Sequence, residues 1–208
     1  MTATNRNVKP FSIHYKDGTS VKVVEDEDYL GSRISRNICS KVEIKRRVGL
    51  GLVRAGELKR LWRGTGITRK RKIQLVDNLI GTKVMYGLET LNTTAKEDDA
   101  IDAMQRRVYR RALGLAPPYV AQQKGLEYVK NDELLLLTAS IPWSRRVKVA
   151  RVWLLHECRT AQEEEPIRKV VFDNNLRPIT WGGRVLPGVS PKRGAWLTTA
   201  LRNEQEIK

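Results

Sequence analysis

Apolar residues recur at helical spacing between residues 41 and 62, and this period constrains the fold more than any other feature of the chain. The stripe consists of Ile44, Val48, Leu52, Ala55, Leu58 and Trp62. Ser40, followed three positions later by Glu43, is typical of a capping box, so we expect a helix that begins near Lys41 and ends at the "RGTG" of residues 63–66. Trp62 belongs to the stripe, which predicts a place in the core rather than a role in stacking on bases.

Two more helices are predicted from their caps. Thr68 can cap a helix that runs to about Tyr86, and Thr94 with Glu97 forms a second capping box that opens another helix. Gly114 is a typical stop for this last helix. Its predicted buried stripe comprises Ile101, Met104, Val108, Ala112 and Leu115.

The N-terminal and C-terminal parts are patterned differently from this helical centre. Residues 11–34 are expected to contain strands, because apolar and polar side chains alternate in "FSIHY" and again in "TSVKVV", and the "KDG" between them predicts a hairpin turn. Beyond Pro117 we expect a short apolar helix over residues 131–139. A second helix is expected from Pro142 onward, although the valines of "WSRRVKVARVWLLHEC" leave a strand open there.

The remaining segments complete a prediction of the fold class. Residues 163–191 carry Pro and Gly punctuation and are expected to form loops and short pieces, and residues 194–206 can form a closing helix. The chain is therefore predicted to be mainly α (α+β). We expect a small N-terminal β element over residues 1–36, a basic helical bundle over 37–116 and a loop-rich helical region over 117–208.

The charge of the chain is strongly unbalanced. It has 39 Lys and Arg against 23 Asp and Glu, a net charge of +16, and residues 41–75 alone contribute +10. A single surface cation is most often merely solvated, but an excess this concentrated is typical of a polyanionic partner, usually nucleic acid. The predicted phosphate-binding residues are Lys45, Arg46, Arg47, Arg54, Arg60, Arg63, Arg69, Lys70, Arg71, Lys72, Arg106, Arg107, Arg110 and Arg111.

Two groups among these residues have a specific local context. On a helical wheel Arg106, Arg107 and Arg110 point away from the buried stripe and Arg111 lies at its margin, so we expect all four to be exposed. The "RKRK" of residues 69–72 occupies the first turn of a helix, where cations oppose the macrodipole. A bound phosphate would resolve that conflict by meeting both the side chains and the unpaired N–H groups.

Motifs that carry catalysis or bind metals are not found in the sequence, so no catalytic residue, metal or cofactor is predicted. The acidic run of residues 25–28 is expected to be a solvated loop, and Asp98 with Asp99 suits the start of a helix better than a polymerase aspartate pair. Cys39 and Cys158 lie far apart, which fits a reducing intracellular compartment. No apolar run approaches the ~20 residues of a membrane span. An anionic membrane surface is a weak competitor to nucleic acid, because the basic helices show no exposed face of Trp, Phe and Leu, and no membrane partner is predicted.

Four blocks of sequence occur in a familiar order: "YLGSRIS" at residues 29–35, "EIKRRVG" at 43–49, "YGLET" at 86–90 and "QRRVYRRALG" at 105–114. Together they resemble the segment after the palm in reverse transcriptases of non-LTR (LINE-type) retrotransposons. "ARVWLLHE" and "SPKRGAWLTTAL" resemble the tail of the same reading frames more loosely. The sequence shows no counterpart of four other parts of these proteins: the fingers, the palm with its catalytic aspartates, the endonuclease and the Cys/His knuckle.

This resemblance implies that the strands ending at residues 29–31 correspond to the last palm strands, near the primer grip. The helices that follow would form the thumb, which holds the template–primer duplex by its backbone. We therefore expect a non-catalytic nucleic-acid-binding protein derived from such a thumb, with RNA favoured over DNA.

Two alternatives remain open. The chain could be a structural subunit of a large ribonucleoprotein assembly such as a ribosome, in contact with RNA and with other proteins. It could also be a reverse-transcriptase fragment that is active only with separate palm and fingers chains.

Overall fold

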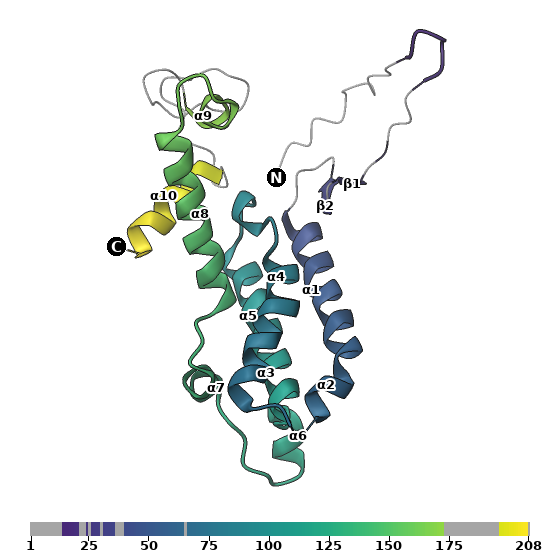
Figure 1. Cartoon of the computed structure of the whole chain (residues 1–208), viewed down its shortest axis with the longest axis vertical. Coiled ribbons are helices and arrows are strands. Elements are labelled where there is room, and N and C mark those ends of the chain that lie inside the picture. The colour runs from purple at the N-terminus through teal and green to yellow at the C-terminus, as the bar shows by residue number, and fades with distance from the viewer. Residues whose placement is uncertain are drawn as a thin grey trace, which may run out of the picture.

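The computed structural model describes residues 14–20, 24, 26–29, 31–35, 40–64, 66–172 and 196–207. In this part of the chain the protein is mainly helical, with a small antiparallel sheet before the helices, and the predicted fold class is confirmed (Figure 1).

The sheet is a tight hairpin. β1 (Asp26–Tyr29) pairs antiparallel with β2 (Ser32–Ser35), and Gly31 supplies the left-handed turn with a φ of 79°. The prediction of a solvated loop was therefore wrong for Asp26, Glu27 and Asp28, because pairing with β2 places these acidic residues in a strand although they do not alternate with apolar ones. An isolated bridge between His14 and Ser20 closes a turn where the "KDG" motif predicts one, and residues 11–13 and 21–23 lie outside the described residues.

The first predicted helix is interrupted. α1 (Ser40–Glu57) and α2 (Lys59–Arg63) are separated at Leu58, whose ψ of 10° leaves the helical region. The predicted capping box is not formed as expected. Ser40 is the first described residue of α1, and the Glu43 carboxylate accepts hydrogen bonds from side chains further along the same helix.

The next predicted helix is continuous but locally widened. α3 (Arg69–Val76) leads into a π-helical turn, η1 (Asp77–Gly81), and then into α4 (Thr82–Met85). Thr68 caps it as predicted, since its side chain accepts from the Arg71 N–H at 3.3 Å.

The fifth α-helix follows a short 3-10 turn, η2 (Leu88–Thr90). α5 (Ala95–Leu113) opens with both hydrogen bonds of the predicted capping box between Thr94 and Glu97. It ends at Gly114, whose φ is 72°, so both predicted ends of this helix are confirmed.

The C-terminal part is also helical where it is described. Its helices are α6 (Pro118–Gln123), α7 (Asn131–Thr138), α8 (Trp143–Thr160), α9 (Pro166–Val171) and α10 (Trp196–Ile207). The strand left open after Pro142 is excluded by α8.

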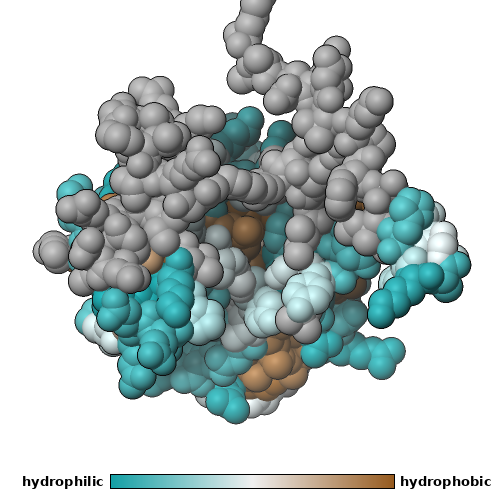
Figure 2. Space-filling model, turned by 90° about the horizontal axis from the view of Figure 1, so that it is seen from above, coloured by the Kyte–Doolittle hydropathy of each residue, from teal (hydrophilic) through white to brown (hydrophobic). Residues whose placement is uncertain are grey.

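Two hydrophobic cores hold these helices together. The larger core lies between α1, α3, α4, α5 and the beginning of α8, and it includes Trp62 as predicted. The smaller core joins the far end of α8 to α9 and α10 through Leu155, Cys158, Phe172 and Ala200. Figure 2, which looks along the bundle from above, shows a described surface that is mostly hydrophilic with limited hydrophobic patches.

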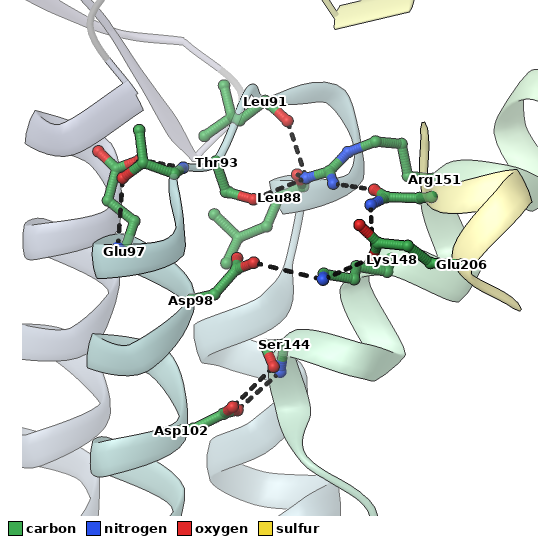
Figure 3. Close-up of polar contacts among 12 residues, drawn as sticks. Leu88, Leu91, Thr93, Glu97, Asp98, Asp102, Ser144, Lys148, Arg151 and Glu206 are labelled. Atoms are coloured by element: carbon green, nitrogen blue, oxygen red, sulfur yellow. Dashed lines mark hydrogen bonds and ion pairs between the residues drawn. The ribbon is translucent and has the colours of Figure 1, made fainter. Parts of the chain in front are cut away.

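A buried arginine attaches the smaller core to the bundle. Arg151 on α8 donates to the carbonyls of Leu88 and Leu91 and, on α10, to the Asn203 side chain at 2.6 Å (Figure 3). Nearby, the Asp102 carboxylate accepts from both the backbone N–H and the hydroxyl of Ser144, which fixes the start of α8 against α5.

Candidate nucleic-acid interface

Eight of the fourteen predicted phosphate-binding residues are exposed, and none of these eight forms an ion pair with a described carboxylate. We call them the exposed cations: Lys45, Arg60, Arg63, Arg69, Lys70, Arg71, Arg107 and Arg111. Their charges are available to an external anion without breaking a described salt bridge.

Most of the exposed cations gather at one end of the bundle. α2, the first turn of α3 and the last turns of α5 lie together at the lower end of Figure 1, and both α2 and α3 contact α5. Lys45, on the first half of α1, is nearer the opposite end. The bundle therefore presents one strongly basic end.

The first turn of α3 combines these cations with unpaired backbone donors. Thr68 accepts from the Arg71 N–H and its carbonyl accepts from the Lys72 N–H, but the N–H groups of Arg69 and Lys70 have no acceptor among the described residues. Because no acidic side chain occupies this turn, the positive end of the helix dipole is reinforced by positive side chains.

Five of the predicted residues are instead used within the protein. Arg54 pairs with Glu57 at 2.8 Å, and the Lys72 ammonium donates to the Trp62 carbonyl at 2.6 Å. Arg46 and Arg47 both pair with Glu43 and both donate to the Gly31 carbonyl. The fifth is Arg110.

Arg47 is buried, contrary to the prediction that it faces a nucleic acid. Its guanidinium lies 2.6 Å from the Glu43 carboxylate and 4.8 Å from the centre of the Tyr86 ring. Burial alone would raise the pKa of Glu43, but the Arg33 N–H and the two guanidinium groups lower it below its ordinary value. Arg46 and Arg47 thus bind the β1–β2 turn to α1.

Arg110 is also buried, so the expectation that all four arginines of α5 are exposed was wrong for it. Its guanidinium donates to the Val129 carbonyl at 3.0 Å and to the Asn131 side chain at 2.9 Å. Burial and the nearby Arg106 charge lower the pKa of Arg110. The chain leading into α7 covers this face of α5, which a helical wheel of α5 alone cannot show. Arg106 is half-buried. Of the four arginines, Arg107 and Arg111 are therefore the two whose side chains are exposed to solvent.

A groove of about 500 Å³ opens beside the basic end, between α3, the end of α5, the end of α7 and the start of α8. Arg69, Lys70 and Arg146 line it together with the apolar side chains of Ile73, Leu113 and Leu137. Arg146 was not among the predicted residues, and its place beside Arg145 in a predicted helix is the only signal the sequence gives for it.

The floor of the groove is anchored by Asp77, which was not predicted from the sequence either. One carboxylate oxygen accepts from the Tyr109 hydroxyl at 2.7 Å and from the Trp143 indole N–H at 3.0 Å, and the other accepts from Arg146 at 2.8 Å. Asp77 is the first residue of the π-helical turn, which ends at Gly81. A Cβ at Gly81 would lie 3.1 Å from the Trp143 ring, so the indole packs directly on this turn.

Asp98 lies in the first turn of α5 and Asp99 follows it, after the capping box of Thr94 and Glu97, so both belong to a helix start as expected. Asp98 faces Lys148 at 3.9 Å, and burial raises its pKa although Lys148 and Arg151 oppose the shift (Figure 3). Among the described residues no three His, Cys, Asp or Glu side chains are grouped to hold a metal ion. Cys158 is a free thiol in the smaller core, and burial raises its pKa.

None of the described helices combines the length and the apolar composition that a membrane crossing requires. Comparison with known proteins gives no further guide to the site: no protein-family model, no curated protein and no solved structure matches the chain.

Proposed function

We propose that this protein is a non-catalytic nucleic-acid-binding protein, with RNA the favoured ligand, that holds backbone phosphates on the basic end of its helical bundle. The observation that carries the proposal is the gathering of exposed cations without described carboxylate partners on α2, the start of α3 and the end of α5. Solvated cations on an ordinary surface are interspersed with acids, whereas residues 58–76 contain no acidic residue.

Electrostatics of this kind supports affinity without sequence preference, because the cations meet phosphates rather than base edges. If about six of them reach phosphates together, affinity falls roughly a thousandfold between about 50 and 200 mM salt. The thumb-like origin suggested by the four sequence blocks is part of the same proposal, since a thumb holds a duplex by its backbone.

The test is a salt series of binding to single-stranded RNA, duplex RNA and duplex DNA, with two triple variants of equal charge. One variant carries Arg69→Gln, Lys70→Gln and Arg71→Gln at the start of α3. On duplex nucleic acid the slope of log affinity against log salt should become shallower by about 0.9 for each phosphate that the variant no longer neutralises.

The matched control changes Lys96, Lys169 and Arg202 to Gln, three exposed side chains in the first turn of α5, on α9 and on α10. Its slope should remain close to that of the wild type. If both variants lose the same affinity, net charge alone explains the binding and the basic end is not the interface.

A structural subunit of a ribonucleoprotein assembly is the second candidate, and exposed apolar residues favour it. On α7 the Leu136 and Leu137 side chains are 80% and 52% exposed, next to Ile141 at 48%. Such a patch suits contact with another protein. This candidate moves ahead if the purified chain binds RNA weakly and the α3 variant binds like the wild type.

A further inference from the structure

We propose that the groove between α3, α5, α7 and α8 accommodates one unpaired nucleotide of the bound nucleic acid, together with its phosphate. This inference rests on the proposed function and specifies which part of the ligand enters the groove. The chemistry of the lining, rather than the presence of a helix end, carries it.

The groove is lined by both charged and apolar side chains. The charged ones are Arg69 and Lys70 on α3 and Arg146 on α8, and the apolar ones are Ile73 on α3, Leu113 on α5 and Leu137 on α7. A nucleotide has the same two parts, an anionic phosphate and a base whose flat face is apolar. Its base can lie against aliphatic side chains only when it is not stacked inside a duplex.

The size of the groove agrees with one nucleotide. A volume of about 500 Å³ lies within the range of roughly 300–1,000 Å³ that is usual for sites holding one small ligand. The groove is thus suited to a strand end or an extruded nucleotide, while the exposed cations outside it hold the neighbouring phosphates.

Asp77 does not oppose an anion in this groove. Its carboxylate already accepts three hydrogen bonds, and its charge is matched by Arg146 at 2.8 Å. The charges of Arg69 and Lys70 therefore remain in excess. Gln74 on α3 also lines the groove. Its amide oxygen accepts from Arg71 at 3.3 Å, which leaves its N–H groups for an acceptor on a base edge.

The experiment compares two RNA hairpins that differ in one nucleotide. The first is blunt, and the second carries a single unpaired 5′-phosphorylated nucleotide at the same end. Wild-type protein should bind the second hairpin about tenfold more tightly, because one added hydrogen bond to a charged group contributes about that gain in affinity. Adenosine monophosphate should also compete better than inorganic phosphate, which separates a nucleotide site from a phosphate site.

Two pairs of variants locate the preference. Leu137→Asp adds a negative charge to an apolar part of the groove lining and should abolish the preference for the unpaired nucleotide. Leu136→Asp makes the same change at the neighbouring exposed position, outside the lining, and should keep it. Arg69→Gln should likewise remove the preference, whereas Lys96→Gln, at an exposed position of α5 that does not line the groove, should keep it. This second pair tests the groove even if Leu137→Asp fails to fold.

The outcomes distinguish this inference from the proposed function. Equal binding of the two hairpins by the wild type, with a normal salt slope, overturns the groove and leaves the phosphate-binding function intact. Equal competition by adenosine monophosphate and inorganic phosphate, or an equal loss in Leu136→Asp and Leu137→Asp, also overturns it. Absence of binding to either hairpin at low salt refutes the proposed function and the groove together.

Discussion

At Gly51 the backbone of α1 lies close to side chains of α4 and α5, and Gly51→Ala tests this packing directly. A Cβ at this position would lie 2.5 Å from the Val84 Cγ2 and 3.0 Å from the Met104 methyl group. Apolar carbons prefer about 3.5–4.0 Å, so either Val84 or the whole of α1 must move by about 1 Å. Val84 is fully buried and β-branched, which leaves it little freedom to turn aside.

The magnitude follows from a matched substitution on the same helix. Gly49→Ala meets nothing within 4 Å, so it should raise the free energy of unfolding by about 1 kcal/mol through helix propensity alone. Gly51→Ala receives the same gain, but overpacking costs about 1–3 kcal/mol. The free energy of unfolding of Gly51→Ala should therefore lie about 1–3 kcal/mol below that of Gly49→Ala.

Urea unfolding followed by circular dichroism measures this difference. In thermal unfolding, the melting temperatures of the two variants should differ by about 2–4 °C for each kcal/mol in a chain of this length. Equal stability of the two alanine variants would refute the close packing of α1 on α4. The comparison does not depend on the exact helix propensity, because that contribution is common to both variants.

Two further predictions concern buried charges. Arg110→Met should lower the free energy of unfolding by about 1–3 kcal/mol, because it leaves the Val129 carbonyl and the Asn131 side chain without their donor. Arg107→Met, at an exposed position of the same helix, should change the free energy of unfolding by no more than about 0.5 kcal/mol. Urea unfolding measures both. Burial raises the pKa of Asp98 in the folded state above its ordinary value of 3.8. As the pH rises through this raised pKa, the buried carboxyl becomes charged and the free energy of unfolding falls. Asp98→Asn should thus stabilise the protein more at about pH 7 than at about pH 4, and the opposite order in urea titrations at the two pH values would contradict the assigned burial.

The features that sequence alone predicted well are those that depend on neighbours within a few positions. Thr68, Thr94 with Glu97, and Gly114 act as helix ends as expected, because each cap bonds to backbone or side chains within the adjacent turn. The apolar stripe placed Trp62 correctly in the core for the same reason, since helical period fixes which side chains share a face.

The errors arise where a distant segment decides the environment. Arg47 is buried because the β1–β2 turn returns to α1, and Arg110 because residues 129–131 cross α5. A single helix has one apolar stripe in its sequence, but α5 is covered on a second side by α7. The acidic β1 has no strand pattern, and only its partner reveals it.

The candidate site was predicted in part. Arg69 and Lys70 were identified from the concentration of charge in the sequence. Arg146 and Asp77 were not, because their relation depends on a contact between residues 69 positions apart in the chain. The apolar residues that line the groove come from three helices, so no short stretch of sequence predicts that they lie together.

α8 belongs to both hydrophobic cores. Its first turns, with Trp143 and Val147, are packed in the larger core, and its later turns, with Leu155 and Cys158, are packed in the smaller core with α9 and α10. Partial unfolding can therefore begin at the end of the molecule with the smaller core while the first half of α8, with Arg146, stays in place. The basic end would keep its shape through such fluctuations, so ligand affinity and the docking of the C-terminal helices could change independently of one another.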